Sequence, residues 1–160
     1  MVEAIADAAL PPLLELFYDR VRRDAELGPV FDSAVHDWPA HLQRLAAFWS
    51  SVMLTSGRYK GNPMLMHLKH GDIITDAMFA RWLVIWQETT DELLPASAAL
   101  AMQAKAQRIA ERLQIALKIY SIPKNPITSS ALADADASRL LRDDACPDGR
   151  LSPLPIRGHS

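Results

Sequence analysis

The chain has 160 residues, 49% of them apolar, which is enough for one domain with a packed core. Its formal net charge of -2 and pI near 6.2 lack the basic excess of a nucleic-acid-binding protein. The single cysteine, Cys146, cannot form an internal disulfide, and no apolar run reaches the roughly 18 residues of a membrane span, so we expect a cytoplasmic protein without a membrane partner.

Helical patterns begin close to the N-terminus. Residues Val2–Leu10 allow only a short helix, which we expect to end before Pro11, because proline removes a hydrogen bond inside a helix. Proline is suited to a first helical turn, and apolar spacing predicts the next helix over Pro12–Arg23. Gly28 and Pro29 then break the helical pattern, which predicts an irregular link.

A third helix is predicted over Trp38–Leu54, with Asp37 as its N-cap and Pro39 in its first turn. Its apolar positions form two neighbouring rows, which make a wider stripe than contact with a single helix requires. His41 belongs to this inner face. The two rows are Leu42, Ala46, Trp49 and Met53, and His41, Leu45, Phe48 and Val52.

A long connection follows, over Thr55–Ile74. Compact domains rarely retain a connection of about 20 residues without a use for it. Within it, Asn62 is a good N-cap and Pro63 a good first helical residue, which predicts a short helix that ends near Gly71. This short helix presents His67 between two long helices.

Two long helices complete the pattern. Thr75 is the expected N-cap of a helix that runs to about Leu94, and Pro95 begins a last helix that runs to about Tyr120. No alternating strand pattern is found, so the predicted fold class is all-α. The inward positions expected in these helices are Met78, Trp82, Ile85 or Trp86, Thr89 and Leu93 in the first, and Met102, Ala106, Ile109, Leu113, Ala116 and Tyr120 in the second.

The composition changes after Tyr120, which predicts a domain over residues 1–120 and a tail over 121–160. Five of the eleven prolines fall in this tail, and no sustained apolar periodicity continues there. We expect the tail to be mostly disordered, with at most a weak helix over Ala131–Arg142.

The histidines leave several readings open. His67 and His70 lie one helical turn apart, but no cysteine partner or His-Glu-x-x-His spacing accompanies them, so a zinc site has little support. His67 could be a metal ligand or a packed core residue.

The aromatic rings expected in the interior also allow two interpretations. These rings form an ordinary core, or they surround a flat apolar cofactor that takes up the surplus surface. Three polar groups, on Tyr18, His41 and Trp82, converge on the same interior, as in a ligand site. The rings expected to point inward are Phe17, Phe31, Phe48, Trp49, Phe79, Trp82 and Trp86.

Several short stretches occur in order at globin-like spacing between about Ala9 and Tyr120. They are FYDRVR at Phe17–Arg22, LGPVF at Leu27–Phe31, W-x-x-HL at Trp38–Leu42, FWSSVML at Phe48–Leu54, RYKGNP at Arg58–Pro63, MHL at Met66–Leu68 and FARWL at Phe79–Leu83. In these stretches the chain resembles the third group of truncated haemoglobins.

The resemblance implies a globin-like fold, a truncated two-over-two helical sandwich around haem (iron protoporphyrin). It makes His67, in preference to His70, the axial ligand to the iron. Tyr18, His41 and Trp82 match the family's distal ligand-binding residues. The residues implied to line or support the cofactor are Phe17, Phe31, Trp49 and Phe79.

The implied function is binding of dioxygen, carbon monoxide or nitric oxide. A peroxidase-like or nitric-oxide-detoxifying activity is the alternative, with electrons from a separate reductase, because the same donors could assist reduction of a peroxide. A third reading is a haem-free helical interaction module that uses the tail to bind a partner.

Overall fold

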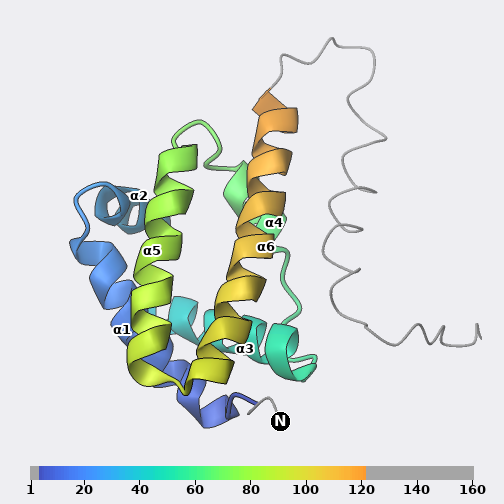
Figure 1. The fold of residues 1–160 in the computed structure, drawn as a ribbon. Helices are drawn as coiled ribbons and strands as arrows, with labels where there is room; N and C mark the ends of the chain where they lie inside the picture. The colour runs from blue at the N-terminus through green and yellow to red at the C-terminus, as the bar shows by residue number, and fades with distance from the viewer. Residues whose placement is uncertain (1–3, 122–160) are drawn as a thin grey trace, which may run out of the picture.

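The computed structural model describes residues 4–121, which fold into a set of α-helices (Figure 1). No strand occurs among these residues, which agrees with the predicted all-α class. The elements are a 3-10 helix at Asp7–Ala9 and helices α1 (Leu10–Arg23), α2 (Leu27–Ala34), α3 (Trp38–Leu54), α4 (Pro63–Leu68), α5 (Asp76–Leu93) and α6 (Ala96–Ser121).

Helices α5 and α6 lie side by side and are joined by a tight turn at Leu94 and Pro95 (Figure 1). Helix α1 packs against α2, α3 and α5, whereas the short helix α4 packs against α6. Helices α3 and α4 are therefore held by different neighbours.

The interior is divided into two clusters of buried side chains. The first joins α1, α3, α5 and the first half of α6, and it includes Phe17, Trp49 and Trp86. The second joins α4, α5 and the second half of α6. Its buried members are Met64, Phe79, Ala110, Leu113, Ala116 and Leu117.

Side-chain caps fix where three helices begin. The Asp37 carboxylate accepts a hydrogen bond from the backbone N–H of Ala40, and the Asn62 amide oxygen accepts one from Leu65. The Thr75 hydroxyl accepts from the N–H of Met78. Each bond satisfies a donor that has no partner inside its helix, and all three predicted caps are confirmed.

The expected break at Gly28 and Pro29 is wrong, because both residues lie inside α2. Pro29 stands in the first turn of the helix, where a missing N–H costs nothing. Gly28 is needed for a different reason: a Cβ at this position would lie 2.5 Å from the backbone oxygen of Arg22. Glycine thus allows the start of α2 to approach α1 closely.

Two smaller expectations also need correction. Leu93 was expected to face inward, but it is 43% exposed and Thr90 is buried in its place. Inside α5 the Thr90 hydroxyl donates to the Trp86 carbonyl, which lets a polar side chain be buried there. In the described part of the predicted helix over Val2–Leu10, only Asp7–Ala9 form a 3-10 turn, and Leu10 already begins α1.

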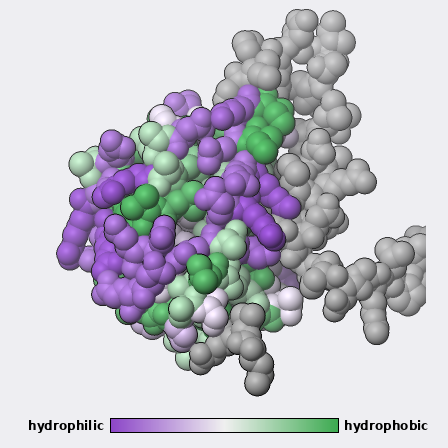
Figure 2. All heavy atoms as spheres, in the orientation of Figure 1, coloured by the Kyte–Doolittle hydropathy of each residue, from purple (hydrophilic) through white to green (hydrophobic). Residues whose placement is uncertain are grey.

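The predicted tail over 121–160, including the possible helix at Ala131–Arg142, lies outside the described residues apart from the last residue of α6. No helix within residues 4–121 combines the length and hydropathy needed to cross a bilayer. On the face drawn in Figure 2, hydrophilic residues separate several hydrophobic patches.

Asp24 ties the α1–α2 corner to α5. One carboxylate oxygen accepts from the backbone N–H groups of Glu26 and Leu27, at 3.0 and 3.1 Å, and the other accepts from Arg81 Nε at 2.7 Å. The hydrogen bond from Arg81 is the main reason that the pKa of Asp24 is lowered below its ordinary value. The ionised form therefore stabilises the fold.

We predict that Asp24→Asn lowers the free energy of unfolding by on the order of 1 kcal/mol near neutral pH. Since the folded-state pKa is depressed, this contribution is complete above the unfolded-state pKa and is lost as pH falls through the folded-state value. Urea unfolding followed by circular dichroism, at neutral pH and at about pH 3, measures the difference between wild type and variant. Asp19→Asn, which removes only an exposed pair with Arg23, is the matched control. An equal Asp24→Asn effect at both pH values would contradict this role.

Candidate functional site

His67 lies on α4, which Asn62 and Pro63 start in the middle of the long connection. Its Nδ1 is 2.7 Å from the Pro63 carbonyl oxygen. Because a carbonyl only accepts, Nδ1 carries the hydrogen and the lone pair resides on Nε2. Burial lowers the pKa of His67, with the Pro63 hydrogen bond opposing and His70 assisting this shift. The ring is therefore a neutral imidazole in a defined tautomer, as a metal ligand requires.

His41 lies on α3 and packs edge-on against Tyr18 and Trp38, with ring centroids 5.7 and 5.6 Å apart. Its Nε2 is buried and has no hydrogen-bond partner among the described residues. Burial, then the charges of Arg44 and His67, lower its pKa to about 4. The two histidines thus lie close enough to interact, although they belong to different helices.

Tyr18, on α1, is only 5% exposed. Burial raises the pKa of its phenol, and a hydrogen bond with the side chain of Trp82 opposes this shift. The indole has a donor and no acceptor, so in this interaction the Tyr18 oxygen can only be the acceptor. Tyr18 thus packs against His41, and Phe17 lies against both Tyr18 and Trp82.

Several apolar side chains that pack against the two clusters are only half-buried. Leu83 and Ile109 contact both clusters, and the inner rows of α3 and the side chain of Leu68 on α4 are similarly incomplete in their packing. The half-buried members are Leu42, Leu45, Phe48, Val52, Leu68, Ile74, Met78, Leu83 and Ile109.

This arrangement fits a flat apolar cofactor with a metal at its centre. The Nε2 of His41 is a buried polar atom that no residue in the range 4–121 partners. His67 offers one neutral nitrogen from the other side, and no group of three or more metal-binding side chains occurs within residues 4–121. One histidine is the usual protein ligand in globins, so the donor set suits haem.

The four aromatic residues expected to line a cofactor occupy different surroundings. Phe17 is fully buried and makes edge-to-face contacts with the rings of Tyr18, Trp82 and Trp86. Trp49 is also within the first cluster, and Phe79, 8% exposed, is within the second. Half-buried Phe31 contacts Tyr18, with centroids 5.7 Å apart. Phe17 and Trp49 thus lie in the first buried cluster, whereas Phe31 lies beside Tyr18.

Three features of the site were not anticipated as functional. Trp38 covers His41 and Tyr18, and the Arg22 guanidinium lies 4.6 Å from the centre of its ring. Arg44 influences His41 electrostatically. The Pro63 carbonyl, which orients His67, follows from helix geometry because it lies four residues before the ring.

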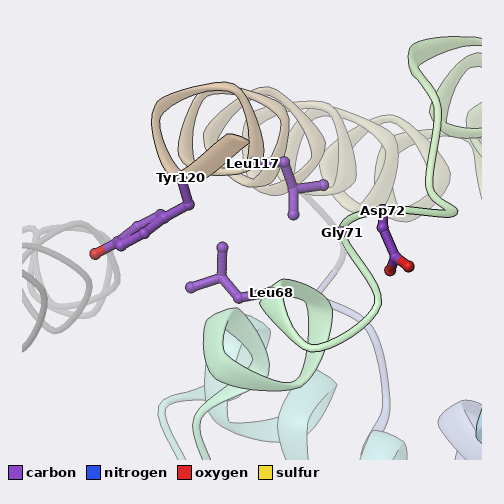
Figure 3. Close-up of a pocket in the computed structure, with 5 residues that line it drawn as sticks. All are labelled: Leu68, Gly71, Asp72, Leu117 and Tyr120. Atoms are coloured by element: carbon purple, nitrogen blue, oxygen red, sulfur yellow. The ribbon is translucent and has the colours of Figure 1, made fainter. Parts of the chain in front are cut away.

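A separate cavity of about 430 Å³ lies beside the end of α4 (Figure 3). Leu68 and Leu117 face each other across it, while Tyr120 and Asp72 stand at opposite sides. Gly71 completes the lining. His70 lies just before this glycine, and its backbone N–H donates to the His67 carbonyl.

The chain is similar to a protein of known class along most of its length. It is 30% identical over 122 residues to the group 3 truncated hemoglobin ctb of Campylobacter jejuni, a match that covers 74% of this chain and 95% of that protein. The crystal structure of a group III truncated hemoglobin from Campylobacter jejuni superposes with a TM-score of 0.66, at 30% identity and the same coverage. No family model matches the chain.

Fold and site together define a globin-like helical protein with one buried or half-buried histidine on each of two helices, His41 on α3 and His67 on α4. The chain belongs to the group III truncated haemoglobins. It is therefore a globin-type haem protein that binds ligands, with the all-α globin-like fold expected from the sequence.

Proposed function

We propose that His67 holds haem as the axial ligand and that the pocket binds a small diatomic molecule, with dioxygen as the principal ligand. When bound, haem supplies an iron atom that takes dioxygen, carbon monoxide or nitric oxide at its open position. The observation that carries the proposal is the contact between His67 Nδ1 and the Pro63 carbonyl at 2.7 Å, which leaves Nε2 as the ligating nitrogen.

Tyr18 and Trp82 act as the polar side of the pocket. The indole N–H donates to the phenol oxygen, and the phenol hydrogen is then free to donate to a ligand that carries partial negative charge. Burial keeps the phenol protonated, so it remains a donor at all ordinary pH values. The unpaired Nε2 of His41 can accept or deliver a proton, or move aside to admit the ligand.

His67→Gly should abolish tight haem binding, because it removes the only proposed bond between the protein and the iron. Added imidazole should restore the visible absorption spectrum by occupying the vacated space. Haemin titration of the purified protein, with and without imidazole, measures this. His70→Gly is the control and should bind haem normally. A normal spectrum in His67→Gly without imidazole would reassign the ligand.

Tyr18→Phe should speed release of dioxygen from the reduced protein. Loss of one hydrogen bond on the order of 1 kcal/mol predicts a roughly fivefold faster rate. Stopped-flow measurement of dioxygen dissociation tests this, with Tyr120→Phe, outside the pocket, as the control. An unchanged rate in Tyr18→Phe would remove its hydroxyl from ligand stabilisation.

Reduction of hydrogen peroxide is the second candidate function. It is favoured by one observation, the stacking of Trp82 on Trp86, which links the pocket to oxidisable rings in the core. Electrons would come from a separate reductase or from small reductants. If the purified protein took up no haemin, both candidates would give way to a haem-free interaction module.

A further inference from the structure

A row of aromatic rings leads from the polar side of the pocket through the core to a half-buried tyrosine. Trp82 and Trp86 stack within 4° of parallel at 5.7 Å between centroids, and Trp86 stacks on Trp49 at 4.7 Å and 18°. Phe48 then lies 5.5 Å from Trp49 and 5.3 Å from Tyr59. The aromatic row is defined as Trp82, Trp86, Trp49, Phe48 and Tyr59.

Helix spacing explains only part of the aromatic row. Trp82 and Trp86 are neighbours because they are four residues apart on α5. Trp49 comes from α3, so its overlap with Trp86 requires tertiary packing. Such a stacked pair stabilises the fold beyond the burial of its surface. Rings in contact are also close enough to exchange electrons. Stability therefore accounts for the burial of these rings without excluding a redox role.

The surroundings of Trp86 disfavour a long-lived radical cation on its indole ring. Trp86 is 1% exposed, and its Nε1–H donates to the Met102 carbonyl oxygen at 3.3 Å. A carbonyl is too weak a base to remove the proton from an oxidised indole, and a buried cation without a charged partner is costly. If Trp86 loses an electron, a neighbouring ring must therefore donate one to it.

Tyr59, in contrast to Trp86, can be oxidised at low cost. Its phenol is half-buried at the edge of the fold, and burial raises its pKa while Arg44 opposes the shift. When a phenol is oxidised it can release its proton to water and become a neutral radical. The end of the aromatic row at Tyr59 is thus the place where an oxidised state is least costly.

We propose that electrons pass inward along the aromatic row from Tyr59 while hydrogen peroxide is reduced in the pocket, a role that rests on the haem site proposed above. Each step at Tyr59 releases one electron and one proton and leaves a phenoxyl radical. A small phenol or ascorbate-class reductant returns one hydrogen atom and restores the phenol. Two such rounds supply the two electrons and two protons that convert one hydrogen peroxide into two waters.

The surface at Tyr59 fits this class of reductant. The reductant need not enter the apolar pocket, because it meets the protein at a partly exposed ring. The nearby Arg44 cation favours anionic molecules such as ascorbate. The reductant therefore reacts at Tyr59, which three rings of the aromatic row separate from Trp82 in the pocket.

The test traps the radical and finds its position. Haem-loaded ferric protein is treated with hydrogen peroxide and a nitroso spin trap, and the labelled residue is identified by peptide mass spectrometry. Wild type should carry the label at Tyr59. In wild type the electron must tunnel past Phe48, because a phenylalanine ring is not itself oxidised. Trp86→Phe and Trp49→Phe fill most of the same space but add a second ring that cannot be oxidised, which lengthens the tunnelling step. Each variant should therefore lose most of the Tyr59 label and shift damage to Trp82, Tyr18 or the cofactor.

Tyr120→Phe is the control and should keep the Tyr59 label. The Trp49 indole makes no hydrogen bond to another residue in the range 4–121, so Trp49→Phe remains informative if Trp86→Phe is unstable. Equal Tyr59 labelling in wild type and both tryptophan variants, or none in wild type, would overturn the relay. The absorption spectrum of each sample is recorded first: failure to bind haemin overturns the proposed function itself, whereas normal binding with unaltered labelling overturns only the relay.

Discussion

The hydrogen bond between the His67 ring and the Pro63 carbonyl is the constraint from which the rest of the site follows. It spans one turn of the six-residue helix α4, so it depends on that helix being formed. An isolated helix this short is unstable in water. Asn62 caps its first turn and Met64 anchors it in the second cluster, so α4 is folded only because α6 holds it.

The same dependence explains why the core is divided. Helix α3 is packed on α1, and α4 is packed on α6, so the inner rows of α3 have no helix that covers them completely. A single continuous core would be more stable for the protein alone. The incomplete burial and the unpaired Nε2 of His41 are expected of a protein whose folded state is stabilised by a bound apolar group.

Most of the fold could be predicted from the sequence because its signals are local. Caps at Asp37, Asn62 and Thr75 mark helix starts, and apolar periodicity marks the long helices. Helix α2 was missed because Gly28 and Pro29 disrupt helices in general, whereas here they stand at its start and against α1. The role of Gly28 depends on a contact with Arg22 that no local pattern reveals.

The site was predictable to a lesser extent. Periodicity placed Tyr18, His41 and Trp82 on inner faces, and the resemblance to a known family singled out His67. Neither could give the tautomer of His67, because it depends on the distance between Nδ1 and the Pro63 carbonyl oxygen. The overlap of Trp49 with Trp86 joins α3 to α5 and was likewise beyond any sequence pattern.

The most direct test of the central claim is the resonance Raman spectrum of the reduced, haem-loaded protein without added ligand. If His67 binds the iron while its Nδ1–H donates to a neutral carbonyl, an iron–imidazole stretching band is expected at the frequency typical of a neutral imidazole ligand. Absence of that band, or a frequency typical of an imidazolate or a thiolate, would contradict the proposed ligation.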